Sequence, residues 1–254
     1  MWGKQELQHI YDDWMDENIP QSNVPYEMMD CLDAKYSGQI RPAFVFRSDE
    51  DSSDIEKEYY YLRDKIVVCH QKLNMMQYAR RNAIECRQEF ETTQNMNFPA
   101  LFGTDRTKIL FYIESTVLLA RNVLDVLATF FARLLLNRRT DSFNDLSKRL
   151  LKEKQQEYMP LQQYFNAAGD NPTHTYRLLC GVTRGRSLRD IIIHQTNIRI
   201  EYLEYRENSE KEKLFVIIKD TPPIEFDDFL TGLCAGVEEI LRVMTTETYK
   251  LIVG

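Results

Sequence analysis

The chain has 254 residues, of which 43% are hydrophobic, so it can bury a large core within one domain. Its formal net charge of -7 argues against a protein that coats nucleic acid indiscriminately, because that mode of binding needs a broadly basic surface. It contains only nine Gly and eight Pro and no Gly/Ser-rich or Pro-rich linker, which favours helix over strand as the main element.

Residues 1–52 are predicted to form an N-terminal cover over the rest of the domain. A short helix is expected from Lys4 to Glu17. Charged residues follow closely on Met1, so no apolar signal segment is expected there. Irregular chain is then expected through Pro20, Pro25, Gly38 and Pro42.

A long helix is predicted to begin near Ser53 and to continue to about Thr92. The Ser53 side chain can cap this helix, and Asp54 and Glu56 place negative charge in its first turn. Apolar residues recur every three or four positions, which predicts one inward-facing side. These residues are Ile55, Tyr59, Leu62, Ile66, Cys69, Leu73, Met76 and Ala83.

A second long helix is predicted to follow Gly103 and to continue to about Asn137, with Thr104 and Asp105 at its start. It is apolar over most of its circumference, so it is expected to be the central helix of the fold. Four charged residues interrupt it, which indicates a core helix and not a membrane span. They are Glu114, Arg121, Asp125 and Arg133.

Three of these charged residues, Glu114, Arg121 and Asp125, are spaced by seven and four positions and therefore lie along one stripe of the helix. Charges on such an apolar surface need partners. One interpretation pairs Arg121 with Asp125 on an exposed edge, which leaves Glu114 unpaired.

Shorter helices are predicted to follow. A polar helix is expected from Asp141 or Ser142 to about Glu157, and Pro160 and Gly169 mark the ends of the next piece.

Pro172 is expected to open a further helix, which reaches a break at 181–185 and resumes through 189–194. This part of the chain is rich in arginine and contains no acid before residue 190, so it predicts either a phosphate-binding patch or a solvated turn. Its arginines are Arg177, Arg184, Arg186 and Arg189.

Residues 198–254 are predicted to form a β-hairpin and a last helix, packed on the same domain. Apolar and charged side chains alternate over 198–202, a β-branched and aromatic run covers 214–218, and polar residues 206–212 close the hairpin. Two strands alone are barely stable in water, so the hairpin is expected to lean on helices or to pair with another chain. An amphipathic helix is expected from Glu225 to about Leu251.

The five cysteines are widely spread, odd in number and without C-x-x-C spacing. This pattern predicts reduced, mostly buried thiols and a cytoplasmic location. The His and Cys residues lack the spacing of a zinc site, and no Gly-rich phosphate loop occurs, so neither a metal nor a cofactor is expected.

The hexapeptide Arg189-Asp190-Ile191-Ile192-Ile193-His194 carries the strongest functional signal. Arg keeps its charge and binds phosphate through a planar fork, and His transfers a proton near neutral pH, so the pair has the chemistry to cleave RNA without a metal. On a helix Arg189 and His194 lie about 140° apart and can border a groove. The three isoleucines are expected to anchor the segment in the core. Taken alone, His194 is more often a core or interface histidine.

With Asp190 after the arginine, the hexapeptide resembles the Arg-x4-6-His motif of the HEPN superfamily, helical proteins many of which are metal-independent ribonucleases of toxin and antiviral systems. The resemblance covers about residues 104–197. It implies a HEPN-like bundle over 53–197 and a homodimer in which two copies of the motif face each other. In that family an acidic residue on an inner helix often orients the motif Arg or His, and Glu114 is the candidate for it.

The resemblance implies that His194 takes the proton of the ribose 2′-hydroxyl or gives one to the leaving 5′-oxygen, while Arg189 holds the scissile phosphate. The expected products are a 2′,3′-cyclic phosphate and a 5′-hydroxyl. Asp190 either accepts a hydrogen bond from one of these two residues or simply adds a favourable charge to the first helical turn. Further RNA contacts are expected from Arg184, Arg186, Gln195 and Asn197.

The sequence therefore predicts a HEPN-type endoribonuclease that cuts RNA in toxin or antiviral defence, with a regulatory partner protein as a further expectation and no membrane contact. The alternative is a non-catalytic HEPN-like helical module that binds RNA, a nucleotide or a partner protein.

Overall fold

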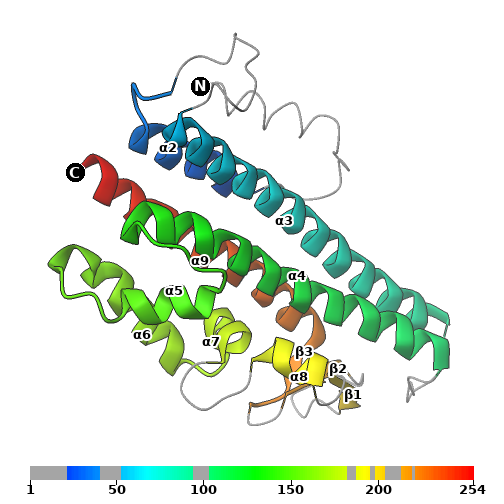
Figure 1. Cartoon of the computed structure of the whole chain (residues 1–254). Helices are drawn as coiled ribbons and strands as arrows, with labels where there is room; N and C mark the ends of the chain where they lie inside the picture. The colour runs from blue at the N-terminus through cyan, green and yellow to red at the C-terminus, as the bar shows by residue number, and fades with distance from the viewer. Residues whose placement is uncertain are drawn as a thin grey trace, which may run out of the picture. The chain divides into compact units, whose positions relative to one another are not determined.

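The protein is described by a computed structural model that covers residues 22–40, 53–93, 103–181, 187–194, 198–203, 213–218 and 221–254. Within these ranges the chain is mainly helical, with a small three-stranded antiparallel sheet before the C-terminal helix (Figure 1). The predicted class, mainly α with a small β element before the last helix, is confirmed.

The described residues group into two compact units whose segments alternate along the chain. The first unit is formed by Met1–Asn74, Asn122–Phe165 and Glu238–Gly254, and the second by Met75–Arg121 and Asn166–Val237. Three long helices contribute residues to both units: α3 (Asp54–Thr93), α4 (Gly103–Leu136) and α9 (Phe226–Val253).

Helix α2 (Val24–Lys35), in the first unit, occupies a stretch for which the sequence predicted irregular chain. Pro25 lies in its first turn, where the missing N–H costs no helical hydrogen bond. The prediction is wrong because Pro25 opens a helix at this point instead of breaking one. The inward side of α2 is apolar, with Met28, Met29, Cys31 and Leu32 fully buried. The helix predicted from Lys4 to Glu17 lies outside the described residues.

Helix α3 begins and ends where the sequence predicted. The Ser53 hydroxyl accepts a hydrogen bond from the N–H of Glu56 (3.2 Å), and the Glu56 carboxylate accepts one from the N–H of Ser53 (2.9 Å). This reciprocal capping box satisfies two N–H groups that the first helical turn leaves unpaired. The predicted inward residues are buried from Tyr59 to Ala83, whereas Ile55 in the first turn is exposed.

Helix α4 also has the predicted bounds, but the polar helix that follows it, α5 (Phe143–Leu150), is shorter than expected. Gln162 donates to the carbonyl oxygens of Leu150 (3.0 Å) and Glu153 (2.7 Å). Because a side chain satisfies these carbonyls, the helix can stop there. The chain then forms the 3-10 turn η2 (Gln156–Tyr158) and helix α6 (Met159–Asp170).

The second unit holds the two short helices around the predicted break. The prediction that Pro172 opens this helix is wrong, because Pro172 lies in the preceding turn and helix α7 (Thr175–Cys180) begins three residues later. His174 caps it: its ring accepts a hydrogen bond from the N–H of Tyr176 (3.1 Å). Gly181 ends it at φ 65°, in the left-handed conformation that glycine adopts without strain. Helix α8 (Leu188–His194) then resumes as predicted.

The sheet of the second unit has the order β1-β2-β3. Strands β1 (Arg199–Leu203) and β2 (Lys213–Ile217) form the predicted antiparallel pair. Strand β3 (Ile224–Glu225) adds a third strand on β2 that two residues are too short to signal in a sequence pattern. As expected, the strand pair packs against a helix: the Tyr202 ring of β1 stacks on Phe90 of α3.

Helix α9 (Phe226–Val253) confirms the last predicted helix, and the residues of its apolar face are buried: Phe226, Phe229, Leu230, Val237, Ile240, Leu241 and Met244. Arg87 of α3 forms an ion pair with Asp227 in the first turn of α9 (2.8 Å). None of the helices in the described ranges is both long and apolar enough to cross a bilayer.

Candidate functional site

Helix α8 carries the Arg-x4-His motif and is fixed at its first turn. The Ser187 hydroxyl accepts a hydrogen bond from the N–H of Asp190 (3.1 Å), which caps the helix, and the Leu188 side chain is almost fully buried. Arg189 and Asp190 follow directly and are both exposed. The guanidinium of Arg189 is thus carried on a capped helix and reaches the surface of the second unit.

The three isoleucines of the motif do not anchor it in the core, contrary to the prediction. Ile191 and Ile192 are only half-buried, and Ile193 is 51% exposed. The prediction is wrong because one side chain, Leu188, already secures α8, and a helix of seven residues that lies on the surface cannot bury consecutive positions on all its sides. Helix α8 therefore presents a cation and an apolar surface together.

Several predicted site residues lie outside what the structure describes. The backbone of His194 closes α8, but its side chain is not among the described groups. The same holds for four whole residues that were expected to contact RNA: Arg184, Arg186, Gln195 and Asn197.

Glu114 of α4 lies next to the segment that follows the motif. Its carboxylate accepts a hydrogen bond from the N–H of Ile198, the buried residue four positions after His194. Burial raises the pKa of the Glu114 carboxyl, and the bond from Ile198 acts in the opposite direction. The Oε1 atom is buried, and no described group donates a hydrogen bond to it. Glu114 thus ties α4 to the chain leaving α8.

Arg121 lies on the same side of α4 as Glu114 but is buried, so the prediction of an exposed edge is wrong. Its guanidinium donates to the carbonyl oxygen of Leu179 (3.0 Å) and to the Sγ of Cys180 (3.1 Å) at the end of α7. A cation is favoured there, because the last carbonyls of a helix carry partial negative charge. Arg121 therefore holds α7 against α4.

Asp125 and Arg177 have structural contacts of their own. The Asp125 carboxylate accepts the N–H of Phe143 (2.9 Å) at the start of α5. Arg177, one of the arginines proposed for a phosphate patch, donates to the carbonyl oxygen of Gly169 (2.8 Å) near the end of α6. Of the two patch arginines that the structure describes, Arg177 and Arg189, only Arg189 is exposed.

A residue that the sequence analysis did not single out is Phe111 of α4, which is 63% exposed and belongs to the second unit, like the motif. It lies three positions before Glu114, on the neighbouring side of the helix. The signal was hidden because this helix is apolar on most sides, so one more phenylalanine in the run looks like a core residue.

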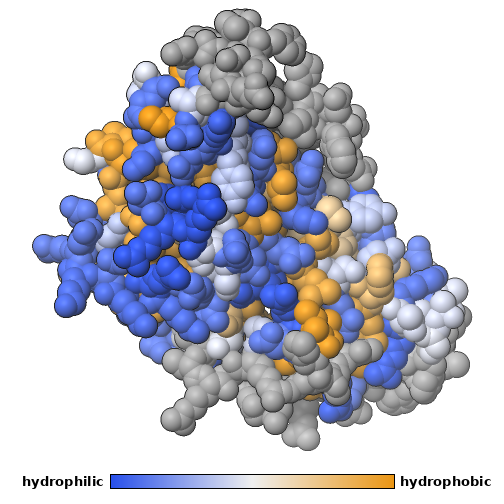
Figure 2. Space-filling view, in the orientation of Figure 1, coloured by the Kyte–Doolittle hydropathy of each residue, from blue (hydrophilic) through white to orange (hydrophobic). Residues whose placement is uncertain are grey.

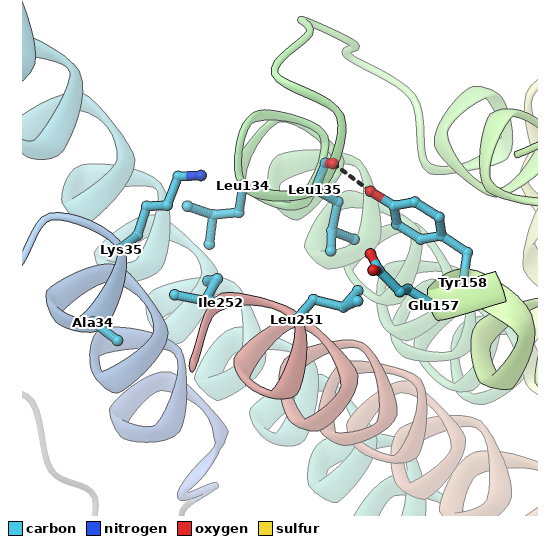
Figure 3. Close-up of a pocket in the computed structure, with 8 residues that line it drawn as sticks. All are labelled: Ala34, Lys35, Leu134, Leu135, Glu157, Tyr158, Leu251 and Ile252. Atoms are coloured by element: carbon cyan, nitrogen blue, oxygen red, sulfur yellow. Dashed lines mark hydrogen bonds between the residues drawn. The ribbon is translucent and has the colours of Figure 1, made fainter. Parts of the chain in front are cut away.

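The first unit has a pocket of about 310 Å³, lined by residues from α2, α4, η2 and α9 (Figure 3). Leu134, Leu251 and Ile252 contribute to its walls, but most of its exposed lining is polar. The Tyr158 hydroxyl donates to the carbonyl oxygen of Leu135 (2.7 Å) and is thereby held in place. Lys35 and Glu157 come from opposite sides of the pocket, so they do not form a paired catalytic group (Figure 3).

The groups that bind metals are scattered in the described ranges, where no three His, Cys, Asp or Glu residues cluster. All five cysteines are free thiols, four of them buried. No protein-family model, curated protein or solved structure matches this chain. The resemblance to the HEPN motif therefore depends on residues 189–194 and on the contacts made around them.

Proposed function

We propose that the protein is a metal-independent endoribonuclease of HEPN type that acts in toxin or antiviral defence. The observation that carries the proposal is the conformation of the hexapeptide: it forms helix α8, whose first turn is capped and whose Arg189 is exposed. An arginine at that place can bind a phosphate of a single RNA strand without any rearrangement of the helix.

The proposed reaction is a transesterification within the RNA strand. The 2′-oxygen of the ribose attacks the adjacent phosphorus, its proton passes to the imidazole of a His194, and the bond from phosphorus to the 5′-oxygen breaks. A second, protonated His194 gives its proton to that leaving oxygen. Arg189 neutralises the charge that builds on the phosphoryl oxygens. The products are a 2′,3′-cyclic phosphate and a 5′-hydroxyl, and DNA is not cut because it lacks the attacking group.

One His194 cannot easily serve as base and acid in the same step, so the proposal includes a homodimer with two motifs in one cleft. The apolar surface of α8 supports this part. Ile193 is 51% exposed beside two half-buried isoleucines, and a surface of this kind is typical of contacts between chains. In such a dimer Asp190 and the exposed Arg189 lie at the edge of the contact, where RNA can enter.

The test is cleavage of single-stranded RNA by the purified protein in EDTA, followed by mapping of the new ends. We expect 2′,3′-cyclic phosphate ends from the unaltered protein and none from Arg189→Ala or His194→Ala. The matched control is Arg149→Ala, which removes an arginine of the first unit that pairs with Asp145. Circular dichroism and light scattering should show the same fold and oligomeric state for all variants.

Cleavage that persists in both motif variants, or that requires Mg2+, would refute the proposal. A protein that binds RNA but never cuts it would instead favour the non-catalytic module. Expression in bacteria distinguishes the nuclease from the non-catalytic module. A nuclease should arrest growth, and His194→Ala should relieve the arrest.

A further inference from the structure

Phe111 is the most exposed large hydrophobic side chain among the described residues, at 63%. Its ring and that of Tyr112 pack in a T-shaped pair with centroids 5.3 Å apart, and most of Phe111 stays exposed to solvent. Apolar side chains also reach the surface elsewhere, in patches between hydrophilic residues (Figure 2), but most of these are about half exposed. An open aromatic face has a specific use, because every nucleobase stacks on one.

Two cations precede Phe111 on its own helix. Lys108 precedes it by three positions and lies on the same side of α4, whereas Arg106, five positions before Phe111, lies about 140° around the helix from it. Both are exposed, and in the described part of the chain neither forms an ion pair. Asp105 is the single acid in these turns of α4, and Glu85 and Glu89 of α3 act on Cys86 together with Lys108, so Lys108 is a local cation on a surface of mixed charge.

The contact of Glu114 connects this surface to the motif. Phe111 and Glu114 are three positions apart, so their Cβ atoms are about 5–6 Å from each other. Glu114 binds the N–H of Ile198, which follows His194 by four residues and is therefore at most about 14 Å from it along the chain. All of these residues belong to the second unit, so a single strand bound at Arg189 has Phe111 within reach.

We propose that Phe111 is the stacking platform for a base of the single-stranded RNA substrate, with Lys108 binding a backbone phosphate beside it. This inference rests on the proposed ribonuclease function and adds a binding subsite to it. The combination of an exposed aromatic ring, an adjacent ammonium group that pairs with no acid among the described residues, and the contact of Glu114 with Ile198 fits a nucleic acid strand. A docked apolar helix of a protein would be the competing occupant, and it would need no cation.

The experiment measures binding of a short labelled oligouridine by fluorescence anisotropy, with His194→Ala in every variant to prevent cleavage. Phe111→Trp keeps a stacking face, Phe111→Leu keeps apolar bulk without one, and Phe111→Ala removes both. We expect the tryptophan variant to bind as the parent does, and the leucine and alanine variants to lose affinity by roughly 5- to 100-fold. Tyr249→Ala, which removes an exposed aromatic of the first unit, should change nothing.

Salt dependence tests the part assigned to Lys108. Removal of one phosphate contact lowers the slope of log K against log salt by about 0.7 for a single strand. Lys108→Gln should show this change, while the Phe111 variants weaken binding at an unchanged slope. If the substitutions acted only by disturbing the fold, the salt slope would not change for Lys108→Gln and stay constant for the Phe111 variants.

The inference is overturned if Phe111→Leu binds RNA as well as Phe111→Trp does, which would indicate an apolar docking surface for protein. It is also overturned if Phe111→Ala leaves binding intact while the unaltered protein cuts RNA, an outcome that spares the proposed function. In the cleavage assay Phe111→Ala should raise KM and leave kcat nearly unchanged. A protein that neither binds nor cuts RNA refutes both proposals.

Discussion

Two glycines of α9 make a matched pair for testing the packing of the second unit. Gly232 and Gly236 are one turn apart, and a Cβ atom added at Gly232 meets no atom within 4 Å. A Cβ atom at Gly236 would lie 2.0 Å from the Oγ1 of Thr175 and 2.5 Å from its Cβ. We predict opposite effects of the two alanine substitutions on the free energy of unfolding.

The expected loss of stability in Gly236→Ala follows from these distances. Rotation of the Thr175 side chain moves Oγ1 away but leaves its Cβ in place, and ordinary contact begins at 3.4 Å, so α7 must move by about 1 Å. This shift strains the hydrogen bond from the Thr175 hydroxyl to the carbonyl oxygen of Gly232 (3.2 Å). Overpacking costs about 1–3 kcal/mol and the hydrogen bond about 1 kcal/mol, against a gain in helix propensity of about 1 kcal/mol. Gly236→Ala should therefore destabilise by about 1–3 kcal/mol.

Gly232→Ala has the same gain in helix propensity and no clash, so it should stabilise by up to about 1 kcal/mol. Thermal unfolding by circular dichroism should separate the variants, since 1 kcal/mol shifts the midpoint by about 2–4 °C in a chain of this size. Thr175→Gly should recover part of the stability lost in Gly236→Ala. Equal midpoints for the two alanine variants, or a more stable Gly236→Ala, would contradict the close approach of α7 and α9.

The remaining predictions concern the first unit. Burial lowers the pKa of His70 to about 4, so the unfolded chain binds the proton first and stability should fall by about 3 kcal/mol as the pH drops from about 6.5 towards 4. Urea unfolding at both ends of this range checks it, and His70→Gln should remove most of the dependence. Ser53→Ala breaks the capping box of α3 and should cost about 1 kcal/mol in the same assay, whereas the exposed Ser37→Ala should cost almost nothing.

Long elements could be predicted from the sequence because their signals are repeated many times. Helix α3 spans 40 residues with a capping box at its start, and the apolar period of α9 is sustained over several turns. Short elements depend on a few residues and on their neighbours. The early end of α5 and the two-residue strand β3 are decided by contacts with other parts of the chain, and Pro25 is compatible either with a turn or with the first turn of a helix.

In the candidate site, too, features set by the local sequence were predicted and features set by contacts with other segments were not. The sequence identified the helix and the exposed arginine, since both follow from the local pattern Arg189–His194. It gave the wrong environment for the isoleucines and for Arg121, because burial depends on which surfaces other segments cover. Phe111 escaped notice for the same reason, since a phenylalanine in an apolar helix carries no mark of exposure.

The unexpected exposure of the motif helix has a physical consequence under the proposed function. A seven-residue helix is too short to be stable alone, and in α8 one buried leucine and one serine cap provide most of the support that the described contacts show. If a second copy of the chain covered Ile191–Ile193, the apolar area that it buries would stabilise this helix by roughly 25 cal/mol for each Å². Assembly of the cleft and ordering of α8 would then be one event, so cleavage should depend on dimer concentration more steeply than a preformed monomeric site would require.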